Sequence, residues 1–582
     1  MKKKYIIISE VEKKKNFNNS FSPFISVFSN RYLLKKYNFK ADYINNYSSN
    51  KNLILKDAKY IVSFYEKILR AMTLSLNRHH NVNYSITFWR ILLGPWLGMF
   101  IYSYFLKWKS IKNLKKINSN YKIKLFPFDQ NDFVPKNMEE FSSFIKSEYW
   151  HQKIGQKVCL NFFKKKNQYV ERYLKKKILK KNSKKNLLKK LISLILYKFP
   201  SRKNNKYLII NSYLGFFRES LLNLKLQQLP TFDLLGNTLK YEKLDIASRF
   251  KIKKSFSNIK FKKKFEHNFI NDFINEIPTA FIEGFQNLRT IYNKLNYPNK
   301  PKVIFSSNFH RNTLLSYYIA KKKENGSKLF IGQHGGLYGA AIFSWFEKHE
   351  LKIANRFFSW GWKNNKKIKK LGIIVKTDKV KWSKNNKDIL LFMRSRNKYP
   401  ASFLSGTNTE NYYSYCQNIN NFINGIKINV KNNLVLRYPP NYNYLQDNNF
   451  LTNTRNLKFN NKKELFKTLK KSLLVINSTH STSFLQVMSI NFPNILIMNG
   501  KDNPLKDQKN FETLRKAGIF HNNYKSAVKF VNKLDNSNKI FNWWYSEKTQ
   551  KAVKIFCKNH SQNNNKIISD IKEEMVNEKK YN

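Results

Sequence analysis

The sequence predicts an α/β protein with two Rossmann-like domains that face a cleft. Short apolar runs typical of buried strands alternate with helical segments between residues 302 and 332, and again from residue 388 onward. This alternation requires parallel sheets, because each crossover helix must pack back on its sheet. Two polar stretches follow such strands, QHGGLYG at residues 333–339 and NSTHSTS at residues 477–483. Both are expected at the carboxyl edges of the sheets, where open α/β folds bind their ligands.

The positive charge is the most unusual feature of the composition. Its formal value of +73 at pH 7 is typical of proteins that bind nucleic acid or an anionic membrane. Lys far outnumbers Arg, however, although Arg is preferred for bidentate phosphate and base contacts. The over-used residues are Lys, Asn, Ile, Phe and Tyr, which all have A/T-rich codons. We therefore attribute most of the charge to genomic bias and do not expect nucleic acid as a partner. A basic nucleic-acid-binding protein remains the alternative from a different class.

The cysteines and the apolar segments indicate a cytoplasmic protein. Cys159, Cys416 and Cys557 are widely scattered, which argues against a disulfide framework and favours a reducing compartment. The start, MKKKYIIISE, contains too short an apolar run for a signal peptide. The longest apolar stretch, residues 91–106, falls short of the ~20 residues of a membrane-spanning helix and is interrupted by Gly94-Pro95. It predicts a buried helix pair, with an interfacial segment as the alternative.

Residues 1–345 are expected to form an N-terminal, acceptor-side domain. Its first half should contain a strand, a helix and an aromatic segment with tryptophans in the core: Lys4–Ser9, Asp57–Leu76, and Thr87–Trp108 with Trp89, Trp96 and Trp108. A basic helical insertion is predicted at about 160–200, and its second half, residues 186–199, gathers apolar residues on one face. An ordinary surface helix fits this pattern, and so does a helix on an anionic membrane. Peripheral contact with the inner face of the cell membrane therefore stays open.

The second half of this domain leads into a βαβ unit. Its expected elements are a strand at Tyr207–Asn211, a helix start within Ile277–Arg289, a strand at Lys302–Ser306, a helix at Arg311–Lys323 and a strand at Leu329–Gly332. Residues 346–387 are expected to connect this domain to a nucleotide-donor domain at 388–560, with a polar tail at 561–582. The donor domain repeats the pattern, with strands at Asp388–Met393, Asn433–Arg437, Leu473–Ile476 and Asn494–Met498, and helices at Tyr412–Phe422, Glu464–Lys471 and from about Phe484.

The stretch QHGGLYG places a histidine, His334, at the carboxyl end of a strand. Its glycines allow the backbone to turn sharply and to approach a ligand closely, so the cleft loop is predicted to comprise Gln333, Gly335, Gly336 and Tyr338. A tight turn with a structural histidine is the alternative. Glu347 could orient His334 or act as general acid or base with it. Glu350 is equally compatible with a solvated helix face.

The stretch NSTHSTS predicts an anion site at the mouth of a helix. Free backbone N–H groups and the helix dipole favour phosphate there, and hydroxyl groups can add hydrogen bonds; the candidates are Ser478, Thr479, Ser481, Thr482 and Ser483. Plain N-capping would need only one of them. Arg394 and Arg437 each end a strand and are suited to phosphate contacts. The sequence contains no Asp-x-Asp motif near a strand end, no P-loop and no G-x-G-x-x-G, so neither a metal nor a cofactor is expected.

Several motifs occur in a defined order along the chain: GPWL around Trp96, GQHGGLYG, a pair of glutamates, RFFSWGW, and the Ser/Thr-rich helix start. This order resembles a family of transferases of O-antigen and surface-carbohydrate gene clusters. More distantly, it resembles GT-B glycosyltransferases and the glycerophosphotransferases of wall teichoic acid synthesis. By position, His334 matches their His-Gly, Arg437 their basic strand-end residue, and Ser478 to Thr482 their phosphate-binding loop. Asn355 and Tyr438 depart from the pattern, where an acidic residue and a histidine are expected.

The resemblance implies a metal-independent glycosyltransferase of GT-B type. It would move a sugar from a nucleotide-activated donor to a surface polysaccharide or a lipid-linked glycan acceptor, as in lipopolysaccharide biosynthesis. In this hypothesis the donor diphosphate lies against Arg437 and the loop at residues 478–483. His334 is either the general base for an acceptor hydroxyl or a hydrogen-bond donor to the leaving phosphate, with Glu347 as its partner. A glycerophosphotransferase of the same layout is the alternative among enzymes.

Overall fold

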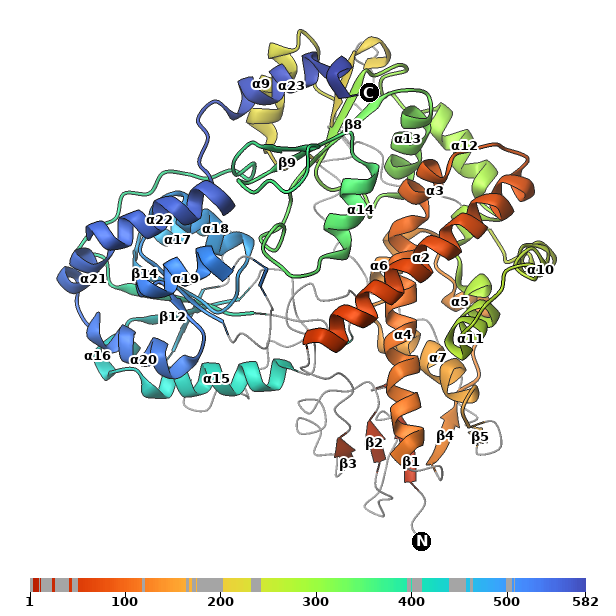
Figure 1. Ribbon diagram of the computed structural model, residues 1–582, viewed down its shortest axis with the longest axis horizontal. Coiled ribbons are helices and arrows are strands. Elements are labelled where there is room, and N and C mark those ends of the chain that lie inside the picture. The colour runs from red at the N-terminus through yellow and green to blue at the C-terminus, as the bar shows by residue number, and fades with distance from the viewer. Residues whose placement is uncertain are drawn as a thin grey trace.

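A computed structural model gives the structure of the chain. It describes residues 4–9, 11, 24–26, 41–43, 51–117, 121–163, 167–169, 174, 202–231, 242–394, 399, 411–438, 457–460, 464–498, 505–506 and 508–581. Across these residues, three parallel sheets carry the fold, two with five strands and one with six. In Figure 1 the C-terminal sheet lies on the left, the N-terminal sheet at the lower right, and the middle sheet at the top between them.

The N-terminal sheet has the strand order β3-β2-β1-β4-β5. Its strands are β1 (Lys4–Ile7), β2 (Phe24–Ser26), β3 (Ala41–Tyr43), β4 (Tyr121–Leu125) and β5 (Asn167–Tyr169). The predicted opening strand is confirmed. Strand β5 contradicts the helix predicted at about 160–200, because the backbone of residues 167–169 pairs with β4 and forms the edge of the sheet instead. The apolar face predicted at 186–199 lies outside the described residues.

The apolar segment around Gly94 forms buried helices of the core. Helix α2 (Lys51–His80) packs against α3 (Ile86–Leu92) and α4 (Gly94–Ile117), and Gly94 begins a new helix as its Gly-Pro pair predicts. Trp89 and Trp96 are 0% exposed and Trp108 is 9% exposed, so the predicted buried helix pair is confirmed. Within the described ranges, no helix combines the length and the apolarity needed to span a bilayer.

The middle sheet has the strand order β10-β9-β8-β7-β6. Its strands are β6 (Tyr207–Ile209), β7 (Val303–Ser306), β8 (Lys328–Gly332), β9 (Arg356–Ser359) and β10 (Ile368–Lys370). Helix α13 (Thr313–Glu324) joins β7 to β8, which confirms the predicted βαβ unit. Strands β9 and β10 lie within the stretch expected to connect two domains. They extend the middle sheet because Phe357 and Ile368 are both fully buried in its core.

The C-terminal sheet has the strand order β13-β12-β11-β14-β15-β16. Its strands are β11 (Asp388–Phe392), β12 (Leu434–Arg437), β13 (Lys458–Phe459), β14 (Ser472–Asn477), β15 (Asn494–Ile497) and β16 (Phe520–His521). The chain moves outward from β11 to β13, crosses back to β14, and then moves outward on the other side. The strand order therefore reverses between β11 and β14, which is the Rossmann topology.

Helices cover the sheets and join their strands. Besides α2, α3, α4 and α13, the helices in the first two thirds of the described chain are α5 (Gln130–Phe133), α6 (Met138–Phe144), α7 (Glu148–Leu160), α9 (Phe216–Lys225), α10 (Ile246–Lys254), α11 (Lys264–Phe273), α12 (Phe285–Asn293) and α14 (Trp345–Ile353). In the last third they are α15 (Asn411–Gly425), α16 (Ile428–Asn432), α17 (Leu465–Leu469), α18 (Thr482–Ser489), α19 (Gln508–Lys516), α20 (Tyr524–Lys533), α21 (Ser537–Trp544), α22 (Glu547–His560) and α23 (Ile567–Val576). Short 3-10 turns lie at Arg202–Asn204, Ile274–Glu276, Thr279–Phe281 and Glu578–Tyr581.

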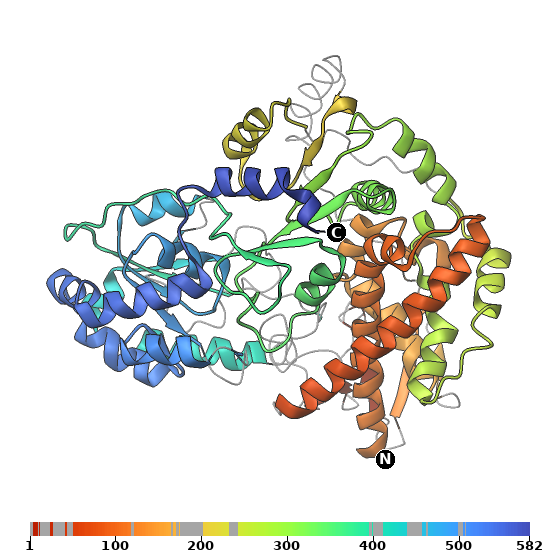
Figure 2. The ribbon, with the colours of Figure 1, turned by 45° about the horizontal axis from the view of Figure 1, so that its top comes forward.

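The C-terminal helices tie the C-terminal and middle sheets together. Trp544 is fully buried, and its Nε1 donates to the Asn491 backbone oxygen. Helix α23 then returns to the middle sheet and lies beside α9, as Figure 2 shows. Although residues 561–582 were expected as a polar tail, α23 buries Ile567, Ile571 and Met575 in the same core cluster as Phe305 of β7 and Phe330 of β8. The predicted α/β fold with Rossmann-like sheets on either side of the glycine-rich loop is confirmed.

Candidate active site at the junction of two sheets

His334 lies at the carboxyl edge of the middle sheet. Strand β8 ends at Gly332, so the histidine follows the strand by two residues, as the sequence predicts. Its side chain is 22% exposed. The hydroxyl of Tyr338 lies 3.3 Å from its Nε2, and the ring of Tyr213 lies 6.1 Å from its ring between centroids. The imidazole is thus held by aromatic neighbours while part of it faces solvent.

A buried glutamate, Glu350, lies behind His334. Its Oε1 is 3.6 Å from His334 Nδ1 and 2.9 Å from His310 Nε2. Glu350 is 0% exposed, because helix α14 turns this side chain toward the sheet. The solvated helix face considered for Glu350 is therefore wrong. His310 was not singled out from the sequence, although it follows β7 much as His334 follows the adjacent strand β8.

Burial controls the protonation of this cluster. It raises the pKa of Glu350 to about 7, although His334 and Tyr338 oppose part of the shift. Burial also lowers the pKa of His310 to about 3, so this imidazole is neutral at physiological pH. The pKa of His334 is lowered by burial and partly restored by the Glu350 carboxylate. A neutral His334 next to a carboxylate that titrates near neutrality is suited to accept a proton.

Glu347, the predicted partner of His334, has a different position. Its Oε2 accepts a hydrogen bond from the backbone N–H of Gly339, 2.8 Å away. Its own backbone N–H donates to the side chain of Ser344, the N-cap of α14. Burial raises the pKa of Glu347. Glu347 thus anchors the far end of the glycine-rich loop to α14, and Glu350, one turn later on the same helix, is the carboxylate that approaches His334.

The Gln333 side chain and the Gly335 carbonyl form hydrogen bonds that hold the glycine-rich loop in place. Gln333 is fully buried and its Oε1 accepts from the backbone N–H of Trp360 and from Nε1 of Trp362, while its Nε2 donates to the Gly335 carbonyl. These bonds attach the loop to the end of β9. Tyr338 is 6% exposed, and burial next to Glu350 raises the pKa of its hydroxyl far above the usual range.

Gly336 brings the two sheets into contact. A Cβ atom on this residue would lie 2.5 Å from the backbone carbon of Ser481 and 2.9 Å from the backbone nitrogen of Thr482. Only a glycine allows the loop to lie so close to the start of α18. A further link is the hydrogen bond from the backbone N–H of Lys506 to the Ala340 carbonyl. The loop that carries His334 therefore lies directly on the predicted anion site.

Some hydroxyl groups at the start of α18 form hydrogen bonds that hold the fold together, and others are placed to contact a ligand. Ser478 is 4% exposed, donates to the Phe392 carbonyl and shares a hydrogen bond with the Tyr415 hydroxyl, so it fixes the loop. Ser481 is the N-cap and accepts from the backbone N–H of Phe484. Thr482 and Ser483 are half-buried in the first turn. Thr479 accepts a hydrogen bond of 2.9 Å from Arg394.

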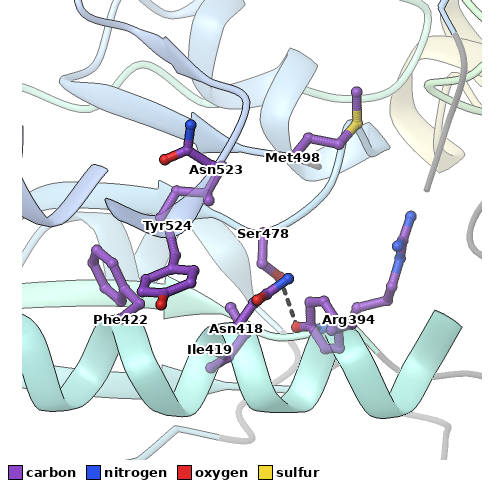
Figure 3. A pocket seen from close by; sticks show the side chains of 10 residues that line it. Arg394, Asn418, Ile419, Phe422, Ser478, Met498, Asn523 and Tyr524 are labelled. Carbon is purple, nitrogen blue, oxygen red and sulfur yellow. Dashed lines mark hydrogen bonds between the residues drawn. The ribbon is translucent and has the colours of Figure 1, made fainter. Parts of the chain in front are cut away.

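Arg394 and Thr479 lie where the strand order of the C-terminal sheet reverses. Arg394 follows β11 and Thr479 follows β14, the two strands between which the reversal occurs. Ligands of Rossmann-like sheets bind at this point. Figure 3 shows the pocket beside it, into which Ser478, Asn418 and Tyr524 project from different elements. A cationic guanidinium and the N-terminal end of a helix thus meet at the crevice of the sheet.

Arg437 lies farther along the same edge, at the end of β12. Its Nη1 donates to Asn460 Oδ1 at 3.2 Å and to Thr468 Oγ1 at 3.3 Å. Burial lowers the pKa of its guanidinium. Both predicted arginines thus occupy the carboxyl edge of one sheet, but Arg394 is the one that contacts the loop at residues 477–483.

The raised pKa of Glu350 predicts a stability effect with a definite sign. In the folded protein Glu350 stays protonated up to a pH of about 7, whereas in the unfolded chain it ionises at lower pH. The stability that this difference represents is fully present below the unfolded pKa, and it is lost as the pH rises through the folded value. Glu350→Gln removes this titration. The stability of the variant relative to wild type should therefore increase between about pH 5 and about pH 8, by up to roughly 3 kcal/mol, as measured by chemical denaturation. The control is Glu547→Gln, an exposed glutamate of α22, and a difference for Glu350→Gln that stays constant with pH would contradict the assignment.

Fold and site together define an α/β protein in which the loop that carries His334, at the carboxyl edge of one parallel sheet, packs against the start of a helix at the carboxyl edge of another. A family model described as LIC12162 family transferase matches residues 22–575. The chain therefore belongs to the LIC12162 family of transferases. A search of curated proteins finds no match. The crystal structure of the calicheamicin glycosyltransferase CalG4 is similar with 9% identity and a TM-score of 0.32, over 64% of this chain and 98% of that chain.

Proposed function

We propose that the protein is a glycosyltransferase that moves a sugar from a nucleotide-activated donor to a surface polysaccharide or a lipid-linked glycan acceptor. One observation carries the proposal: Gly336 packs against the backbone of Ser481, which brings the His334 loop of one sheet onto the anion-binding helix end of another. A group that transfers between a phosphate and a hydroxyl needs both features within one site.

The donor diphosphate would lie at the start of α18. The positive end of the helix dipole favours an anion there, and Thr479, Thr482 and Ser483 supply hydroxyl groups. Arg394 adds a positive charge beside Thr479 and Arg437 a second one along the same edge. These fixed donors would stabilise the negative charge on the departing nucleoside diphosphate, so the proposed reaction needs no metal.

His334 would act on the acceptor. In the proposed step the acceptor hydroxyl oxygen attacks the anomeric carbon and its proton passes to the imidazole of His334. The bond between the anomeric carbon and the phosphate oxygen breaks, and the nucleoside diphosphate leaves with the electron pair. Ionised Glu350, 3.6 Å from Nδ1, would stabilise the imidazolium that forms. Glu350, rather than Glu347, is therefore the proposed partner of His334.

Thermal-shift measurements with UDP-, GDP-, CMP- and CDP-linked donors test the donor side. One class of nucleotide sugar should raise the melting temperature of the wild type, because a ligand at about 100 times its Kd adds roughly 2.7 kcal/mol of stability. Arg394→Ala should abolish most of this rise, since it removes the cation at the crevice. Arg515→Ala removes an exposed arginine that pairs with Glu512 on α19 and should leave the rise unchanged.

The same screen separates the alternatives. A rise with CDP-glycerol and none with nucleotide sugars would identify a glycerophosphotransferase of the same layout. If no donor stabilises the wild type and RNA binds with a steep salt dependence, the proposal is wrong and the nucleic-acid-binding alternative holds.

A further inference from the structure

Helix α9 carries its apolar residues on the side that faces solvent. Phe217 is 82% exposed, Phe216 and Leu224 are each 62% exposed, and Leu221 is 46% exposed. A surface helix normally turns such a stripe toward the core and its polar residues outward. Contiguous apolar surface of this kind marks a contact with a membrane or with another molecule.

These residues form one arc of the helix. At about 100° per residue, Phe216, Phe217, Leu221 and Leu224 fall within roughly 140° of the helix circumference. The half-buried Ser220 also lies in this arc, and its small side chain adds no charge to it. The rest of the circumference buries Leu222 and Asn223, and α23 packs against the helix. The exposed arc is therefore an apolar face on a helix that is already docked by its other side.

Basic residues border the arc. Arg218 and Lys225 lie next to each other along one margin of the helix, roughly 40–60° beyond Leu221. Lys225 is exposed, and its Nζ is 3.3 Å from Ser569 of α23. The whole chain carries a formal charge of +73. Along the opposite margin lies Glu219, whose Oε1 accepts hydrogen bonds from the N–H and the hydroxyl of Ser212. An aromatic and aliphatic face with cations along one margin complements the surface of an anionic bilayer, where the side chains enter the acyl boundary and the cations meet the headgroups.

The arc starts one short loop away from the candidate active site. Strand β6 leads through Tyr213 to Gly215, whose φ of +82° turns the chain into α9. The Tyr213 hydroxyl accepts a hydrogen bond from Asn308, and its ring lies 6.1 Å from that of His334 between centroids. Figures 1 and 2 both show α9 beside α23 at the outer rim of the middle sheet. A membrane that contacts α9 would thus lie close to the edge at which His334 acts.

We infer that α9 docks the protein on the surface of an anionic phospholipid membrane through Phe216, Phe217, Leu221 and Leu224. Docking presents the carboxyl edge of the middle sheet to the headgroup layer. The consequence for the acceptor, that it is a glycan whose lipid anchor stays in the bilayer, rests on the proposed function. Membrane binding itself does not rest on it.

Vesicle flotation of the full chain tests the inference. One set of vesicles contains phosphatidylcholine alone, and the other contains equal parts of phosphatidylcholine and phosphatidylglycerol. The wild type should float with the anionic vesicles, and less so at high salt. The double variant Phe216→Ser/Phe217→Ser should bind at least about tenfold more weakly, which corresponds to about 1.4 kcal/mol. Both side chains are mostly exposed, so the fold should persist, and thermal unfolding checks this.

Phe250→Ser is the matched control. Phe250 is 66% exposed on α10, away from the arc, so this variant should float like the wild type. The inference is overturned if the wild type does not float, if the double variant floats as well as the wild type, or if the control loses as much binding. The double variant should also keep the donor-induced thermal shift. If no donor shifts the melting temperature of the wild type, the result counts against the proposed transferase. If the double variant floats as well as the wild type, the result counts only against membrane docking through α9.

Discussion

Replacing His334 with alanine should lower the turnover number by about two to four orders of magnitude, the usual contribution of a general base. The variant should remain folded, because the side chain is 22% exposed and neither β8 nor α14 depends on it for a cap. Donor binding should persist, since the proposed anion site lies at the start of α18. The measurement is turnover with the donor found in the thermal-shift screen, together with surface-glycan production in cells.

The control for this prediction is His267→Ala, which removes an exposed histidine of α11. It should have no effect on either measurement. Wild-type glycan from the His334→Ala protein would show that His334 is a structural residue of a tight turn. Glu350→Gln should give an intermediate loss, because the imidazole would keep its place but lose the charge that stabilises its protonated form.

Replacing Gly336 with alanine should reduce turnover by roughly two orders of magnitude, because a displacement of about 1 Å in a site can have that effect. The new Cβ would lie 2.5 Å from the Ser481 carbon and 2.8 Å from its oxygen, so the loop must move away from α18. Both contacts are to backbone atoms, which cannot rotate aside. The donor-induced thermal shift should change little, whereas kcat should fall.

Gly335→Ala is a matched control one residue away. Its Cβ would meet only the Tyr338 ring, at 3.6 Å and 3.7 Å, which is ordinary van der Waals contact. This variant should keep most of its turnover. Equal losses in the two variants would mean that the loop needs glycine for its flexibility, and the contact with Ser481 would no longer explain the effect.

Most of the strands could be predicted because buried parallel strands leave a strong local pattern. Four consecutive buried residues at Val303–Ser306 and again at Leu434–Arg437 appear in the sequence as short apolar runs. The strands that the sequence did not predict are ones whose pairing with a neighbouring strand matters more than their own composition. Asn167–Tyr169 and Ile368–Lys370 are polar or basic, yet each becomes a strand because a neighbouring strand needs a partner at the edge of its sheet.

The candidate site was predicted in part, and its division of roles was not. Five Ser and Thr residues in one stretch indicated an anion site, but the sequence could not show that Ser478 is occupied by Phe392 and Tyr415. Glu347 and Glu350 differ by three positions on one helix, so either could approach His334 on spacing alone. The capping of α14 takes Glu347 to Gly339 and leaves Glu350 to face the histidines.

By itself the sequence determined the α/β class, the positions of the glycine-rich and serine-rich loops at strand ends, and the residue types available there. These features are local, because a strand, a turn and a helix start depend on residues that are close together along the chain. Only the tertiary structure decided that Gly336 meets Ser481, that Arg394 lies at the reversal of strand order, and that α9 presents its apolar face to solvent. These depend on which sheet edges face each other and which helix faces are covered, and such contacts join residues that lie far apart along the chain.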